Sequence, residues 1–175
     1  WSGILESMEI NIIDKSQNGI DIPAYGSLLM IANHPFGIID GLIMCSLASK
    51  VRSDFKILTH ETLQFAPELN NYILPIDFNE NSKTTIKNNL ITTKKAKEHL
   101  LNKGLLIIFP SGSVSVSNNL KKMYEVDEWK NFTAKIIKQT KTDVLPIFFD
   151  GKNGLLFHLF ASKLKNQTLK YSSYI

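Results

Sequence analysis

Short apolar runs alternate with helical patterns along this chain, and this alternation most constrains its fold. The runs are typical of buried strands and lie at 27–32, 55–58, 72–78, 105–109 and 144–149. Helices are expected between and after them, at about 40–50, 82–102, 127–139 and 155–164. Because parallel strands need a crossover, usually a helix, this order predicts a single α/β domain. Its sheet would be mixed but mostly parallel, with helices on its faces.

Three segments are less regular. Pro75 interrupts the run at 72–78, so we expect that strand near an edge of the sheet. The stretch 59–71 looks irregular or helical, with Pro67 breaking it, and residues 1–24 fit a helix followed by a strand.

The composition fits one compact domain. The chain has 175 residues and is 43% hydrophobic, which suffices for a single core. Its one cysteine, Cys45, lies in an apolar run, so we expect a core residue in a reducing compartment. No signal peptide or membrane-spanning run is evident. The chain starts at Trp1 without a methionine, so we expect a segment of a longer protein.

The positive charge is almost entirely lysine. Net charge is +4, and Arg52 is the only arginine. A lysine-rich surface suits an anionic membrane or an acidic carrier protein, although simple solubility explains it equally well. We expect no nucleic-acid binding, since arginine is nearly absent and no aromatic platform is interleaved with the basic residues.

The loop at 33–41 joins an expected strand to an expected helix and holds a histidine and a carboxylate. An imidazole moves protons near neutral pH, and a nearby carboxylate stabilises its charged form. On a continuous helix His34 and Asp40 would lie roughly 240° apart, so only a loop at Pro35 and Gly37 brings them together. In a plainer alternative, Asp40 only favours the helix N-terminus and His34 binds a backbone carbonyl.

A second loop, 109–115, also follows a strand, where sites of α/β sheets lie. Its serines would suit a serine hydrolase, but no Gly-x-Ser-x-Gly elbow is present. Together the two loops resemble motifs of the glycerolipid (lysophosphatidic acid) acyltransferase superfamily, His-x-x-x-x-Asp and Phe-Pro-Glu-Gly-Thr-Arg-Ser. Residues 74–77 and 144–147 resemble its second and fourth blocks, so the likeness covers about 27–165. It is nearest to the hemolysin-like branch, which often carries Asn-His-Pro-x-Gly-x-x-Asp-Gly.

The resemblance implies an acyltransferase domain over 1–175 with a glycerol-3-phosphate acyltransferase-like fold. It implies His34 as general base with Asp40 as its partner. The substrate-binding residues it implies are Asn33, Gly37, Ser111, Gly112 and Ser113. No bound cofactor or metal is expected; acyl-CoA or acyl carrier protein would donate the acyl group to a lipid or amino-acid acceptor. The expected location is cytoplasmic, peripheral to the inner face of the cell membrane.

The chain departs from the family at its acceptor motif. The family's acceptor-binding glutamate falls at Ser111 and its phosphate-binding arginine at Val114, so the usual groups that bind a glycerol phosphate are missing. Arg52 or a lysine could substitute for that arginine, but no motif in the sequence singles one out. A non-catalytic lipid- or membrane-binding domain is therefore the alternative function. In that alternative the apolar residues and lysines of 152–165 form a membrane-facing helix.

Overall fold

The computed structural model describes residues 1–61, 63, 67–77, 83–114, 129, 131–151 and 153–154, and all structural statements concern these residues. The helices are α1 (Ser2–Ser7), α2 (Ile38–Ser49), α3 (Lys83–Leu101) and α4 (Asn131–Thr140), with a 3-10 turn η2 (Pro67–Leu69). The strands are β1 (Leu28–Ala32), β2 (Phe55–His60), β3 (Ile73–Ile76), β4 (Leu105–Ile108) and β5 (Asp143–Ile147).

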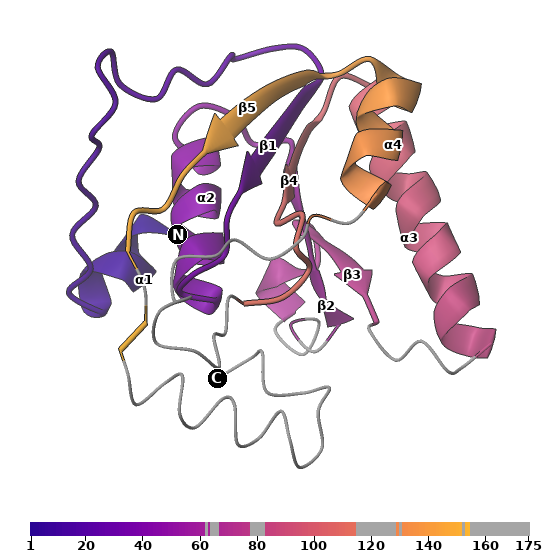
Figure 1. Ribbon diagram of the computed structural model, residues 1–175, viewed down its shortest axis with the longest axis horizontal. Helices are drawn as coiled ribbons and strands as arrows, with labels where there is room; N and C mark the ends of the chain where they lie inside the picture. Colours follow the sequence, from indigo (N-terminus) through magenta and orange to yellow (C-terminus); the bar gives the residue numbers. More distant parts are fainter. Residues whose placement is uncertain are drawn as a thin grey trace.

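The five strands form one sheet in the order β3-β2-β4-β1-β5 (Figure 1). Every pairing between them is parallel, so the expected fold class is confirmed and the sheet is entirely parallel in this part of the chain. β1 lies between β4 and β5, with Ile31 opposite Ile108 and Ala32 opposite Ile147. β3 is an edge strand, as Pro75 predicts.

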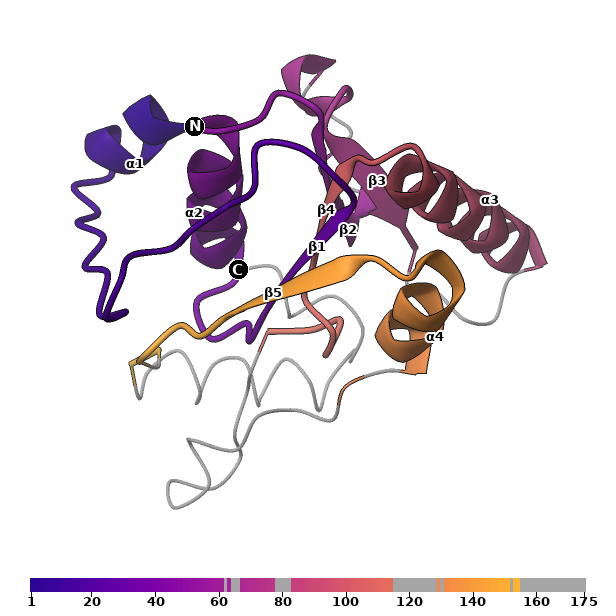
Figure 2. The ribbon, with the colours of Figure 1, turned by 90° about the horizontal axis from the view of Figure 1, so that it is seen from above.

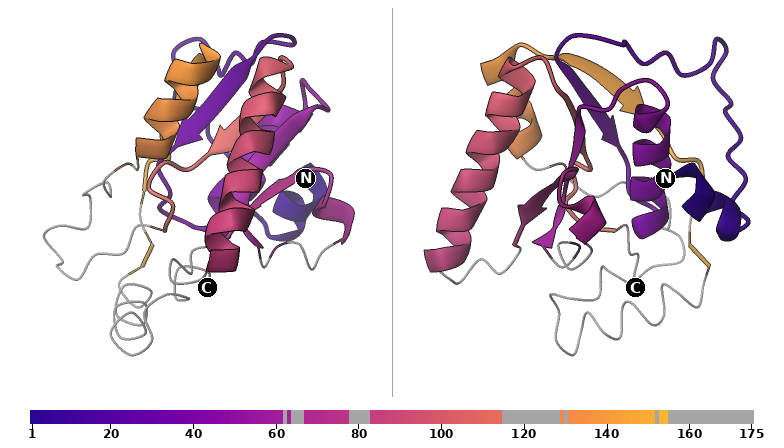
Figure 3. Two further views of the ribbon diagram at one scale, coloured as in Figure 1. Left: turned by 90° about the vertical axis from the view of Figure 1, so that its right-hand side faces the viewer. Right: turned by 180° about the vertical axis from the view of Figure 1, so that it is seen from behind.

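Helices cover both faces of the sheet (Figures 2 and 3). On one face α2 packs over a core that includes Met30, Phe55 and Ile107. On the other face α3 and α4 pack over Leu29 and Leu106. Residues within one strand alternate between these two cores, and all five residues of β1 are buried. Such a doubly covered strand explains why 27–32 reads as a continuous apolar run.

Some expected elements differ or cannot be compared. The helix expected in 1–24 is α1, but the strand after it is wrong: residues 10–27 form no strand. α4 begins at Asn131, and residues 155–164 lie outside the described residues. Cys45 is a core residue, as expected; burial raises its pKa to about 12, so the thiol stays protonated. Along the described segments, no helix has the length and apolarity needed to cross a membrane.

Arg52 stabilises the amino-terminal edge of the sheet through hydrogen bonds. Its side chain is 4% exposed, and the guanidinium pairs with both carboxylate oxygens of Asp54, at 2.8 and 2.6 Å. It also donates to the carbonyls of Gly26 and Lys103, each at 2.7 Å. These residues precede β1, β2 and β4, so the arginine ties together three strand entrances. The loops that follow β1 and β4, at 33–37 and 109–114, lie at the opposite, carboxyl-terminal edge of the sheet, so Arg52 is not placed to substitute for the family's phosphate-binding arginine there.

Candidate active site

His34 and Phe109 meet because their strands are neighbours. β1 and β4 run in parallel and end at the same edge of the sheet, at Ala32 and Ile108. The loops that follow therefore start side by side, although they are far apart in sequence. The His34 and Phe109 rings stack with centroids 4.0 Å apart and an interplanar angle of 21°. This stacking holds the imidazole flat against the second loop.

The loop at 33–37 brings His34 to Asp40. The His34 Nδ1 lies 3.0 Å from Asp40 Oδ2, and the imidazole is 16% exposed, whereas the carboxylate is fully buried. Because a carboxylate only accepts hydrogen bonds, Nδ1 carries the proton and donates it to Asp40. The other ring nitrogen, Nε2, is then left with a lone pair that can take a proton.

Asp40 serves the helix as well as the histidine. It lies in the first turn of α2, and its Oδ2 also accepts the backbone N–H of Phe36 at 2.8 Å. Its Oδ1 is buried and has no hydrogen-bond partner among the described residues. Asp40 can therefore stabilise the start of α2 and also orient His34. Its Oδ2 accepts both the Phe36 N–H and the His34 Nδ1–H.

Gly37 caps α2 in a conformation that favours glycine. Its φ is +68°, and a Cβ there would lie 3.2 Å from a methyl of Val114. The glycine therefore allows the sharp turn between His34 and Asp40 and lets the second loop approach closely.

The second loop is a turn held by its own hydrogen bonds. The N–H of Gly112 donates to the Phe109 carbonyl at 3.0 Å, and the Ser111 hydroxyl donates to the Ser113 carbonyl at 2.9 Å. Ser111 is 7% exposed and is not among the residues that line the pocket described next, so its expected contact with the substrate stays a prediction. The Gly112 N–H is committed to the turn, so the Ser113 N–H is the better candidate donor to a reacting oxygen.

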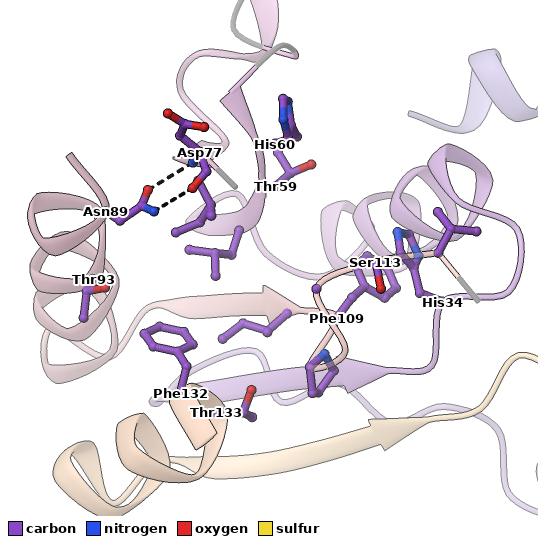
Figure 4. Close-up of a pocket in the computed structure, with 16 residues that line it drawn as sticks. His34, Thr59, His60, Asp77, Asn89, Thr93, Phe109, Ser113, Phe132 and Thr133 are labelled. Atoms are coloured by element: carbon purple, nitrogen blue, oxygen red, sulfur yellow. Dashed lines mark hydrogen bonds between the residues drawn. The ribbon is translucent and has the colours of Figure 1, made fainter. Parts of the chain in front are cut away.

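A pocket of about 280 Å³ begins at His34, near the lower end of the size range of ligand sites, roughly 300–1,000 Å³. Figure 4 shows His34, Phe109 and Ser113 at one end and Asp77 and Asn89 at the other. Its other lining residues are Leu58, Thr59, His60, Ile76, Thr93, Ile108, Pro110, Gly112, Val114, Phe132 and Thr133. The pocket thus extends from the histidine between the sheet and the α3 and α4 helices. In the described part of the chain, no group of three or more His, Cys, Asp or Glu residues is placed to hold a metal ion.

Comparison with sequence models of protein families matches residues 15–150 to the family described as Acyltransferase. This range covers most of the chain and includes both loops. The chain belongs to the acyltransferase family. A comparison with curated proteins found no match. Within the matched range of this acyltransferase domain, His34 lines one end of the pocket and is hydrogen-bonded to the buried Asp40.

Asn33 follows β1 and joins the His34 loop to the segment after β5. It is not among the residues that line the pocket. Its amide donates to the Phe149 carbonyl at 2.9 Å and accepts the Phe149 N–H at 2.7 Å. Asn153 donates to the Pro35 carbonyl at 2.6 Å. Both contacts follow from the pairing of β1 with β5, which sets Ala32 opposite Ile147. Phe149 and Asn153, which follow β5, thus hold the loop that carries His34 in place.

Replacing Asn153 by alanine is expected to lower kcat about fivefold with little change in KM. One hydrogen bond contributes about 1 kcal/mol, and its loss frees the loop beside His34. Steady-state transfer kinetics well below the melting temperature measure the effect, with exposed Asn102→Ala as the matched control. A lower melting temperature with an unchanged kcat would mean that Asn153 only stabilises the fold.

Sequence reasoning missed the pocket residues contributed by β2, β3 and α3. His60 ends β2, and Asp77 directly follows β3, so both satisfy the rule that sites lie beyond the carboxyl ends of strands. Burial lowers the pKa of His60 below its usual value, against the opposing effect of Glu61 and Asp77. The sequence does place titratable residues at these strand ends. It does not reveal the strand order that brings them to the same pocket.

Proposed function

We propose that this protein transfers an acyl group from an acyl thioester to a hydroxyl or amine, with His34 as general base. The observation that carries this proposal is the 3.0 Å hydrogen bond between the buried Asp40 and His34, which lines one end of the pocket. It supplies an oriented base whose charged form lies beside a buried carboxylate. Membership of the acyltransferase family supports the reaction class.

In the proposed step, Nε2 of His34 takes the proton from the acceptor as its oxygen or nitrogen attacks the thioester carbonyl. The carbon–sulfur bond then breaks, and the departing thiolate receives the proton from the imidazolium. The products are an ester or amide and a free thiol. A positioned base of this kind contributes about 10²- to 10⁴-fold in rate.

The negative charge on the tetrahedral oxygen needs a hydrogen-bond donor. The Ser113 N–H is our candidate, because Ser113 lines the pocket close to His34 and the neighbouring Gly112 N–H is already bonded (Figure 4). Gly112 has a φ of +70°, a conformation that favours glycine in this turn.

The donor in this proposal is acyl-CoA or acyl carrier protein, and the acceptor is a lipid precursor. We further propose that the reaction takes place on the cytoplasmic face of the cell membrane. The lysines of α3 support this location, since Lys83, Lys87, Lys94 and Lys95 are all exposed. Such lysines are attracted to anionic lipid headgroups.

The direct test is release of free thiol from an acyl-CoA by the purified protein, with and without a panel of hydroxyl and amine acceptors. We expect acceptor-dependent thiol release together with an acylated product detected by mass spectrometry. Lipid binding without any thioester cleavage would favour the non-catalytic alternative, to which the serine and valine at positions 111 and 114 also point.

A further inference from the structure

The outer face of α3 exposes large apolar side chains. Ile86, Leu90 and Leu101 are 53%, 65% and 54% exposed. Because each residue of an α-helix advances about 100° and rises about 1.5 Å, these three lie within an arc of about 60° along about 22 Å of the helix. Single exposed leucines are ordinary, but apolar side chains aligned on one face are typical of an interaction surface. We refer to Ile86, Leu90 and Leu101 as the apolar row.

Lysines lie beside the apolar row. Lys87 and Lys94 are exposed one helical turn before and one turn after Leu90. Over its whole length α3 contains five lysines and one glutamate, so the helix carries a net charge of +4, equal to the net charge of the whole chain. The rest of the chain is therefore neutral overall. The surplus positive charge is concentrated on the helix that also exposes the apolar row.

The same helix forms one wall of the pocket. Asn89 and Thr93 line the pocket, and each directly precedes a residue of the outer surface, Leu90 and Lys94 (Figure 4). The buried residues of α3 lie on a different face from the apolar row; they are Thr85, Thr92, Ala96 and Leu100. Because a helix with its side chains is about 10–12 Å across, a partner on the outer face would lie about one helix diameter from the pocket.

We propose that the outer face of α3 docks on an anionic lipid surface. The apolar row enters the layer between the headgroups and the acyl chains, and the lysine ammonium groups reach the lipid phosphates while their stems lie along apolar surface. A straight row on one helix can meet a planar surface along its whole length. This inference rests on the proposed function, because it names the surface at which that reaction takes place.

Sedimentation of the full chain with vesicles tests the docking. Vesicles of phosphatidylglycerol and phosphatidylcholine in equal parts should bind at least about tenfold more tightly than phosphatidylcholine alone, since each lysine near an anionic surface contributes about fivefold. Leu90→Glu should weaken this binding about tenfold or more, because it puts a charge into the apolar layer. Ile13→Glu is the matched control: Ile13 is 73% exposed, in the segment between α1 and β1 on the other side of the molecule (Figure 1).

A polarity-sensitive fluorophore attached to Leu90→Cys reports insertion directly. The native Cys45 is 1% exposed, so labelling is confined to the introduced thiol. Emission should become stronger and shift to shorter wavelength when the anionic vesicles are added. The same fluorophore on Ile13→Cys should keep its emission. Melting temperatures of the variants establish that each is folded.

The charge contribution is tested at one lysine on each side of the sheet. Lys87→Gln should weaken binding to the anionic vesicles about fivefold, because it removes one lysine from the docking face. Lys50→Gln removes an exposed lysine at the end of α2, on the opposite side of the sheet, and should change binding less than about twofold.

Failure to bind anionic vesicles would overturn the inference, and so would binding that Leu90→Glu does not weaken. Binding of an acidic protein through these lysines, without affinity for vesicles, would overturn it as well. Thiol release from an acyl-CoA is measured separately, without vesicles. If the protein docks but never cleaves the thioester, the proposed function fails while the docking surface stands. If it cleaves the thioester but does not dock, only the docking surface fails.

Discussion

Replacing His34 by asparagine should reduce acyl transfer to about 1% of the wild-type rate or less, since a positioned general base contributes about 10²- to 10⁴-fold. Asparagine is the sharper substitution because its amide N–H can still donate to the buried carboxylate of Asp40. An amide cannot take up the proton of the acceptor. The initial rate of thiol release, with acceptor present, measures the loss.

The alanine variant at the same position should be equally inactive but less stable. It leaves the fully buried Asp40 carboxylate without its imidazole partner, and an uncompensated buried charge is costly. His99→Asn is the matched control, because His99 belongs to α3 and its Nε2 lies 3.0 Å from the Leu105 carbonyl, in the amino-terminal part of β4. Retention of more than a few per cent of activity by a folded His34→Asn protein would exclude His34 as the base.

Replacing Asp40 by asparagine should lower kcat by about 10²- to 10⁴-fold while the protein remains folded. The amide oxygen can still accept the Phe36 N–H, so the bond between the first turn of α2 and the loop before it is kept. The variant has no negative charge to stabilise the imidazolium that forms during the reaction. Because the carboxylate is fully buried behind His34, we expect KM to change little.

Measuring kcat and KM separately distinguishes stabilisation of the His34 imidazolium by Asp40 from simple capping of α2. Asp143→Asn removes an exposed carboxylate at the amino end of β5 and should leave kcat and KM unchanged. If Asp40→Asn lowers the melting temperature but keeps at least a tenth of the wild-type kcat, Asp40 only stabilises α2.

Local patterns predicted much of the fold. The five apolar runs became the five strands. The reason is clearest for β1 and β4, which are buried along their whole length and must therefore be apolar on both faces. The helix at 82–102 was placed within one residue at each end, since it has a long run without Gly or Pro and Gly104 follows its end. The strand expected in 1–24 was wrong because its apolar residues do not show a sustained alternation.

The candidate site was predicted only in part. His34 and Asp40 share one short loop, so their proximity depends on a turn that Pro35 and Gly37 make readable in the sequence. Asn33 and Ser111 were placed at the substrate, yet their side chains bond the backbone of Phe149 and of the turn itself. A motif reports which residue types occur together, but not which way each side chain points.

The sequence by itself determined the alternation of strands and helices and the histidine–carboxylate pair, because both depend on residues close together in the chain. Only the tertiary structure decided which loops face one another. The order β3-β2-β4-β1-β5 stacks Phe109 on His34 and places Asp77 at the other end of the same pocket. Arg52 lies at the amino-terminal edge of the sheet, away from this pocket. Strand order depends on packing between distant segments, and no local pattern encodes it.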